Sequence, residues 1–175
     1  ESEAENTVDN IKYTTDFDSI LNADLVIEVV SENLKLKKSI FEELDLKCPK
    51  NTIIATNTSL SRPEILRDLN KKREGGLSGT PIKNISDKVL KFLYRETNNE
   101  LILIGVGGVG SASDVYRKIK LGASLVQMYT SLTYGGPQLI NKILIDLVKL
   151  VKDDGFANIS EAVGVNNKWI KPLIS

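Results

Sequence analysis

The chain has 175 residues, and its 23 Lys and Arg side chains balance 23 Asp and Glu, so the formal net charge is zero. That balance argues against a protein held on nucleic acid by bulk electrostatics. The absence of histidine and the single cysteine exclude Ser-His and Cys-His catalytic pairs, histidine metal sites and an intrachain disulfide.

Strand and helix patterns alternate in the first third of the chain. Residues 24–30 are a nearly continuous apolar run, typical of a strand buried on both faces of a parallel sheet. Residues 34–46 predict a helix, because apolar residues recur there at helical spacing, and Pro49 ends it. Residues 52–56 predict a second buried strand.

A long polar stretch, residues 57–79, follows the second strand. A loop of this length inside a compact domain is usually functional. Ser86 has the residue type of a helix N-cap and is followed by Val89, Leu90 and Leu93 at helical spacing. We therefore expect a helix that begins at Ser86.

The last part of the chain repeats the strand-and-helix alternation. Residues 101–104 and 123–129 predict strands, and residues 113–121 a short helix between them. A long amphipathic helix is expected from Pro137 to Gly155. The whole pattern predicts an α/β protein of parallel βα units, either an open doubly wound sheet or part of a barrel.

In both architectures ligands bind at the carboxyl ends of the strands. The glycine cluster at residues 105–110 lies there, and Gly105, Gly107 and Gly110 have the spacing of a dinucleotide fingerprint. That interpretation needs an acidic residue at the end of the next strand, where this chain has Gln127 to Thr130. A phosphate-binding turn is favoured instead, and a tight turn without a ligand is the alternative.

Several blocks of sequence occur together in the order and spacing of one known family. They are 55–58 (ATNT), 61–63 (SRP), 75–81 (GGLSGTP), 104–109 (IGVGGV), 122–130 (GASLVQMYT), 134–137 (YGGP), 155–156 (GF) and 161–164 (EAVG). From about residue 55 to 164 the chain resembles class 2, quinone-type dihydroorotate dehydrogenases. This resemblance covers most of the chain beyond its N-terminal third.

The resemblance implies an FMN enzyme of pyrimidine biosynthesis that oxidises dihydroorotate to orotate with a quinone acceptor. It implies that FMN contacts lie at seven positions: Thr56, Ser78, Gly79, Gly107, Gly108, Tyr129 and Thr130. Asn57 and Thr58 would bind the pyrimidine substrate, which suits an amide that can both donate and accept hydrogen bonds. By family, the protein would act at the mitochondrial inner membrane.

The departures from that family limit what we expect of this chain. The family has an eight-stranded barrel, and the sequence supplies its last three strands. The family's catalytic base, a serine on an earlier loop, has no matching position here, so no catalytic residue is assigned. Without a base near the substrate carbon, proton abstraction fails. We therefore expect the chain to be inactive alone.

Residues 11–61 resemble the second half of the NAD domain of 3-hydroxyacyl-CoA dehydrogenases. The resemblance is carried by 23–30 (ADLVIEVV), 32–37 (ENLKLK), 41–45 (FEELD) and 52–59 (TIIATNTS). It implies an NAD site near Glu32 and Lys37. The family's catalytic histidine has no counterpart in this histidine-free chain, which excludes hydroxyacyl oxidation.

Together the two resemblances predict a chimera, with half of a Rossmann-like domain at residues 1–55 and the last part of an FMN-binding (β/α)8 barrel at 56–175. A non-catalytic α/β module is the alternative to an enzyme.

The acidic start without Met predicts a fragment or a processed N-terminus, not a signal peptide. No apolar run is long enough to cross a bilayer. Unpaired strand edges of an incomplete barrel predict self-association.

Overall fold

The computed structural model describes residues 12–20, 22–28, 34–49, 52–56, 66 and 76–167. Within these residues, four strands form one parallel sheet: β1 (Leu25–Glu28), β2 (Ile53–Thr56), β3 (Ile102–Val106) and β4 (Leu125–Gln127). Each strand is hydrogen-bonded to the next one in the chain, in the order β1-β2-β3-β4. The prediction of parallel βα units is confirmed, and their assignment to a partial barrel remains a prediction.

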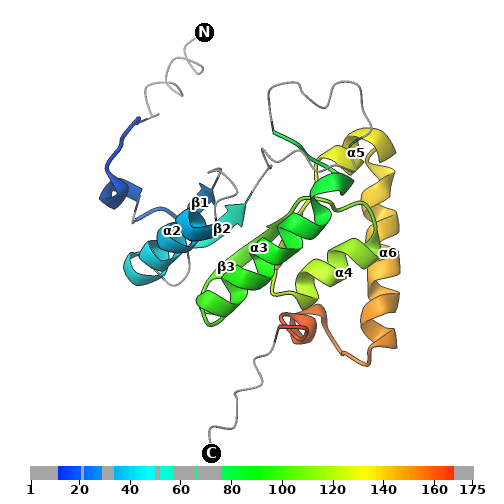
Figure 1. Ribbon diagram of the computed structural model, residues 1–175. Helices are drawn as coiled ribbons and strands as arrows, with labels where there is room; N and C mark the ends of the chain where they lie inside the picture. The colour runs from blue at the N-terminus through cyan, green and yellow to red at the C-terminus, as the bar shows by residue number, and fades with distance from the viewer. Residues whose placement is uncertain are drawn as a thin grey trace, which may run out of the picture.

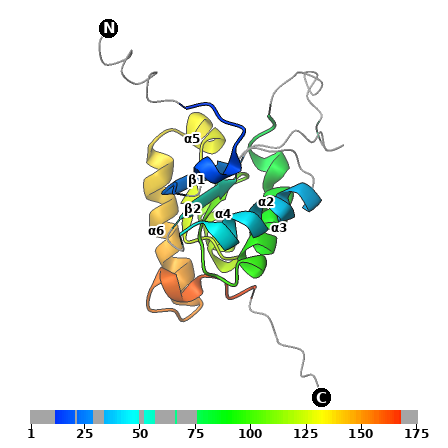
Figure 2. The same ribbon diagram turned by 90° about the vertical axis from the view of Figure 1, so that its left-hand side faces the viewer.

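Helices connect and flank these strands. They are α2 (Leu34–Lys47), α3 (Lys83–Glu96), α4 (Ala112–Lys120), α5 (Thr130–Gly135) and α6 (Gln138–Asp153), with 3-10 turns η1 (Phe17–Ile20), η2 (Thr80–Ile82) and η3 (Ile159–Ala162). Figure 1 shows α2, α3 and α4 in front of the strands, and Figure 2 shows the same layers from the side. No helix in this described part of the chain has the length and apolar character needed to span a membrane.

The helices pack on one face of the sheet through two apolar clusters. Phe41 and Leu44 of α2 are fully buried against Leu93 of α3 and Leu103 of β3. A second cluster joins α4 to α6, with Ile119 and Ile143 buried in it. Burial of each such side chain contributes about 1.5–3 kcal/mol, so these contacts fix the helices on the sheet.

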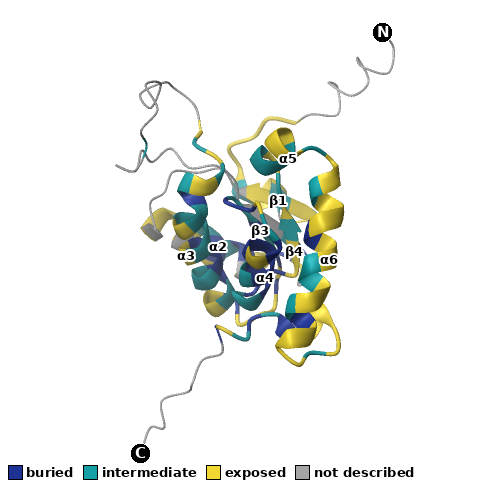
Figure 3. Cartoon of the chain, turned by 90° about the vertical axis from the view of Figure 1, so that its right-hand side faces the viewer, coloured by how far each residue is buried: buried dark blue, intermediate teal, exposed yellow. Residues whose placement is uncertain are grey.

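The opposite face of the sheet is open. In β3 the exposure alternates along the strand, with Leu103 buried and Ile102 exposed. Leu25 and Ile27 of β1 and Leu125 of β4 are about half exposed, at 47%, 56% and 53%. In Figure 3, β1 is coloured mostly as exposed, whereas α4 is coloured mostly as buried. The sheet therefore carries one packed face and one apolar face in contact with solvent.

The structure differs from the sequence-based expectations at the start of one helix and around α5. Ser86 was expected to cap α3, but the helix begins at Lys83, directly after η2. The Ser86 hydroxyl donates a hydrogen bond to the carbonyl oxygen of Val106 instead, so it ties α3 to the end of β3. The predicted strand 123–129 is shorter in the structure, where β4 ends at Gln127, and the short helix α5 is not among the elements that the sequence predicts.

The predicted domain boundary between residues 55 and 56 falls inside β2. This strand pairs with β1 through residues 53–56 and with β3 through residues 53–55. The N-terminal segment and the rest of the chain therefore share one sheet. The division into two domains of different origin remains a prediction.

Candidate functional site

A pocket of about 460 Å³ lies at the carboxyl ends of β3 and β4. The described residues that line it are Gly76, Ser78, Gly79, Ile82, Val106, Gly107, Gly108, Val109, Gln127, Met128, Tyr129 and Thr130. Its volume is within the range of small-molecule sites, which is about 300–1,000 Å³. Ligands bind at this edge in parallel α/β sheets, so the pocket is the candidate site.

Six of the seven flavin positions predicted from the sequence line this one pocket: Ser78, Gly79, Gly107, Gly108, Tyr129 and Thr130. They come from three separate segments, which the fold brings together. The seventh, Thr56, is the last residue of β2, and its side chain is outside the described part of the structure. Asn57, Thr58 and Glu32 lie outside the described residues, as does the side chain of Lys37.

The turn after β3 needs glycine for a steric reason. Gly107 and Gly108 have φ of +91° and +71°, which L side chains rarely adopt. A Cβ on Gly108 would lie 2.5 Å from Cα of Lys83, and one on Gly107 would lie 2.8 Å from Cδ1 of Ile82. The turn therefore lies in close contact with the start of α3, and both glycines line the pocket.

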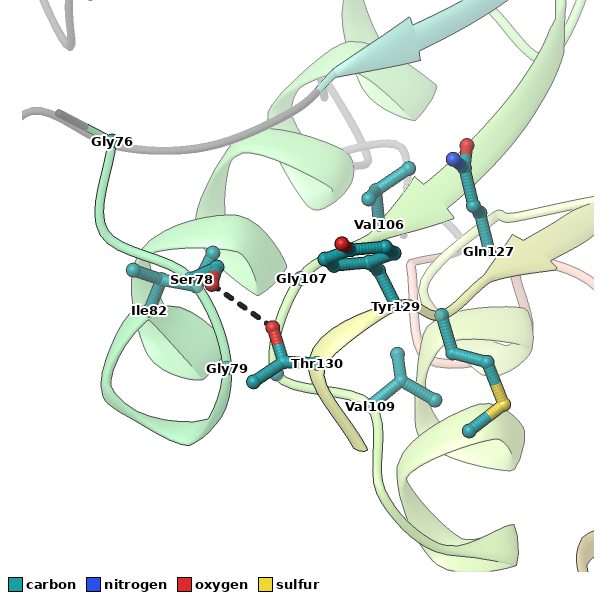
Figure 4. A pocket seen from close by; sticks show the side chains of 12 residues that line it. Gly76, Ser78, Gly79, Ile82, Val106, Gly107, Val109, Gln127, Tyr129 and Thr130 are labelled. Carbon is teal, nitrogen blue, oxygen red and sulfur yellow. Dashed lines mark hydrogen bonds between the residues drawn. The ribbon is translucent and has the colours of Figure 1, made fainter. Parts of the chain in front are cut away.

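Two hydroxyl groups meet on another wall of the pocket. Thr130 Oγ1 donates a 2.9 Å hydrogen bond to Ser78 Oγ. In Figure 4 the Tyr129 ring lies between this pair and Gln127. Among the described lining residues, none carries a carboxylate. The pocket thus offers hydroxyl groups and glycine backbone, a donor set that suits an anionic phosphoester.

Asp114 anchors the loop that leaves the pocket for α4. Its Oδ2 accepts hydrogen bonds from the backbone N–H of Gly110 at 3.2 Å and from Ser111 Oγ at 2.8 Å, and its Oδ1 pairs with Lys83. Burial alone would raise the pKa of Asp114, but the Lys83 pair and these hydrogen bonds hold it below its usual range. The carboxylate of Asp114 therefore links the first turn of α3 to the first turn of α4.

Several lining residues were not singled out from the sequence. Val106 and Gln127 end β3 and β4, so their place at the carboxyl edge was a usable signal. Ile82 and Met128 gave no such signal, since apolar residues at these positions fit a core equally well. No group of three or more metal-ligating side chains occurs in the described ranges of the chain.

Comparison with known proteins assigns the family. The family model described as dihydroorotate dehydrogenase matches residues 29–151. The chain belongs to the dihydroorotate dehydrogenase family. The match contains the glycine turn after β3 and the six pocket residues that the sequence predicts to contact FMN.

Individual relatives of this family are of the quinone type. The chain is 46% identical to a dihydroorotate dehydrogenase (quinone) of Xanthobacter autotrophicus over 124 residues, which is 71% of this chain and 35% of the relative. It is 44% identical over 117 residues to a mitochondrial dihydroorotate dehydrogenase (quinone) of Arabidopsis thaliana, covering 66% of this chain and 25% of the relative. The chain thus spans about a third or less of the length of these curated relatives.

A solved structure of the family extends the likeness over nearly the whole chain. The ligand-free dihydroorotate dehydrogenase of Eimeria tenella has a TM-score of 0.74 and 26% identity, covering 96% of this chain and 49% of that one. The family match also begins at residue 29, inside the segment that resembles 3-hydroxyacyl-CoA dehydrogenases. The resemblance to an NAD domain remains a prediction from sequence.

Proposed function

We propose that this chain forms the flavin-phosphate part of an FMN-dependent dihydroorotate dehydrogenase, which oxidises dihydroorotate to orotate with a quinone as acceptor. The proposal rests on the observation that Ser78, Gly79, Gly107, Gly108, Tyr129 and Thr130 line the same pocket. When bound, FMN supplies the oxidant for the removal of two electrons from the substrate.

The residues around the pocket fit the phosphate and ribityl end of FMN. The hydroxyls of Ser78 and Thr130 are 2.9 Å apart, so both can turn toward one oxygen-rich group. At Gly107 and Gly108 the backbone can approach an anion closely, because no Cβ stands between its N–H groups and the ligand. We assign these groups to binding the phosphate ester.

The apolar lining favours the rest of the cofactor. Val106, Val109 and Met128 face the same pocket, and the Tyr129 ring, 78% exposed, lies beside it. Thr56 ends the neighbouring strand β2, so we assign it a contact with FMN as well. Asn57 and Thr58, which follow it in the sequence, are proposed to bind the pyrimidine substrate.

The remaining roles follow from the family alone. Relatives are named quinone-type and, in Arabidopsis, mitochondrial, and we extend both properties to this protein, including a place at the mitochondrial inner membrane in pyrimidine biosynthesis. No residue of this sequence matches the family's serine base. We expect the 175-residue chain to bind FMN without oxidising dihydroorotate.

The alternative interpretations have less support. An NAD site at Glu32 and Lys37 has no described geometry to test it. The family match spans the predicted junction between residues 55 and 56, which favours a single dihydroorotate dehydrogenase segment over a chimera.

Titration of the purified chain with FMN, followed by quenching of flavin fluorescence, tests the proposal. Saturable binding, weakened at least several-fold when riboflavin replaces FMN, is expected because riboflavin lacks the phosphate. Equal binding of the two flavins, or none, would refute it. Addition of dihydroorotate to the flavin-loaded chain should leave the absorbance at the flavin band unchanged, whereas bleaching would show that a base is present after all.

A further inference from the structure

A lysine ammonium group is buried directly behind the glycine turn. Lys118 of α4 is 1% exposed, and its Nζ donates hydrogen bonds to Ser86 Oγ at 2.7 Å and to Asp87 Oδ1 at 3.0 Å. Burial lowers the pKa of Lys118, and the Asp87 carboxylate opposes that shift. Burying a charge is costly even when it is paired, and apolar packing at such a position often serves stability as well. The lysine therefore calls for an explanation beyond stability.

The side chain of Lys118 packs closely against the end of β3. A Cβ on Gly105 would lie 2.9 Å from Lys118 Cδ and 3.2 Å from its Cβ. The glycine at position 105 thus leaves room for the lysine stem against the strand. Ser86 approaches the next glycine in the same way, since a Cβ on Gly107 would lie 3.3 Å from Ser86 Cβ.

A relay of hydrogen bonds runs from the ammonium to the turn. Lys118 donates to the Ser86 hydroxyl, which in turn donates to the carbonyl oxygen of Val106. Donation from a charged group polarises the hydroxyl and strengthens its own hydrogen bond. The relay therefore fixes the orientation of the peptide unit between Val106 and Gly107.

Fixing that carbonyl also fixes the amide that follows it. A trans peptide unit is planar, so the N–H of Gly107 points opposite to the Val106 carbonyl and away from Ser86. Val106, Gly107 and Gly108 all line the pocket. The lysine on the helix side thus sets the direction of a donor in the turn that borders the pocket.

Lys118 is also the end of a chain of five charged side chains between α3 and α4. The order is Lys83, Asp114, Arg117, Asp87 and Lys118, with oppositely charged neighbours 3.0–3.8 Å apart except for the closer Lys83–Asp114 pair. Three cations face two carboxylates, which leaves one positive charge behind the turn. A positive charge close to an anion site strengthens binding even without direct contact.

We propose that Lys118 is a positioning residue for the phosphate of the cofactor, acting through Ser86 on the Val106–Gly107 peptide and through the surplus positive charge behind the turn. It is not among the residues that line the pocket. This inference rests on the proposed function of the same site, because it assigns how that site distinguishes a phosphorylated flavin from its dephosphorylated form.

The test compares the ratio of riboflavin and FMN dissociation constants in four chains: wild type, Lys118→Met, Ser86→Ala and the double variant. General loosening of the fold weakens both flavins alike, so this ratio isolates the phosphate. We expect Lys118→Met to reduce the ratio about tenfold, as for a lost charge-assisted hydrogen bond, and Ser86→Ala to reduce it less. In the double variant the losses should be less than additive, because both act on one relay.

Lys120→Met is the matched control. Lys120 lies in the same last turn of α4, but its ammonium pairs with Asp154 and is not part of the chain of charged side chains that runs from Lys83 to Lys118. Its ratio should equal that of the wild type. If Lys118→Met does not fold, as judged by circular dichroism and thermal unfolding, the ratio of dissociation constants measured for Ser86→Ala tests the proposal.

The outcomes separate this inference from the proposed function. A wild-type chain that binds both flavins equally, or neither, overturns the proposed function and this inference with it. A wild-type chain that prefers FMN, with the same preference kept in folded Lys118→Met and Ser86→Ala, overturns the positioning role and leaves the proposed function intact.

Discussion

Thr130 donates a hydrogen bond to Ser78 across 52 positions of the sequence, at 2.9 Å. The pair joins the start of α5 to the segment before η2 and closes one side of the pocket. Gly79 supports this contact, since a Cβ there would lie 3.2 Å from Thr130 Cγ2. Both hydroxyls are thereby held where a phosphate or ribityl oxygen could replace one partner of the bond.

Removal of one hydroxyl should therefore affect binding more than stability. Thr130→Val keeps the shape of the side chain and should weaken FMN binding about tenfold, while the free energy of unfolding changes by about 1 kcal/mol or less because the bond is exposed. Fluorescence titration and urea unfolding measure the two quantities. Thr133→Val, on the same helix and outside the pocket lining, is the control. Equal affinity in the two variants would contradict the assignment of Thr130.

Gly108→Ala tests the close approach of the turn to α3. The added Cβ would lie 2.5 Å from Lys83 Cα in a backbone with φ of +71°, so the turn must move. We expect a loss of about 2–4 kcal/mol in the free energy of unfolding, from overpacking added to left-handed strain, together with loss of FMN binding.

Gly155→Ala separates overpacking from left-handed backbone strain as causes of the expected loss in the free energy of unfolding. Gly155 follows α6 with φ of +81°, and a Cβ there meets nothing within 4 Å. This variant should cost about 1 kcal/mol, from backbone strain alone, and should bind FMN as the wild type does. Similar losses for the two variants would show that contact with α3 does not require the glycine in the turn.

Acid should remove the stabilising contribution of the Asp114 carboxylate to the free energy of unfolding. The pKa of this carboxyl is lowered in the folded chain by Lys83 and its hydrogen bonds, against the effect of burial. Its contribution is therefore fully present above the unfolded pKa of about 3.9 and is lost as the pH falls through the folded value. Asp114→Asn should cost about 1–3 kcal/mol at pH 7 and progressively less below pH 4.

Urea unfolding between pH 2 and pH 7 measures this effect. Asp146→Asn removes an exposed carboxylate that pairs with Lys149 on α6, and it should leave the acid dependence of stability nearly unchanged. If Asp114→Asn has the same pH dependence as the wild type, the carboxylate of Asp114 does not stabilise the junction of α3 and α4.

How far the sequence predicts this structure depends on the kind of signal. Helix α6 and strand β3 were found close to their observed bounds, because their apolar periodicity is long or bounded by glycine. The prediction that Ser86 caps α3 is wrong, because its hydroxyl donates a hydrogen bond to Val106 of β3, which comes later in the chain. Such a long-range partner leaves no local pattern.

The same limit applies to the site. The glycines of the turn and the residues after β4 could be located because parallel strands place their ends at one edge. The buried position of Lys118 could not be located, because a lysine within the helix 112–120 is indistinguishable by type from the partly exposed Lys120 two residues further on. Its partners Ser86 and Asp87 are more than 30 positions away.

The open face of the sheet predicts self-association. Leu25, Ile27 and Leu125 expose about half of their surface on this face, and contiguous apolar surface of this kind promotes contact between molecules. We expect the sedimentation coefficient to rise with concentration. Leu125→Lys, which places a charge on the face, should shift the association to at least several-fold higher concentration.

Leu46→Lys adds the same charge at an 84% exposed leucine of α2, away from the sheet, and should have little effect. A wild-type chain that stays monomeric at all concentrations, or an equal effect of the two variants, would show that the open face does not mediate association.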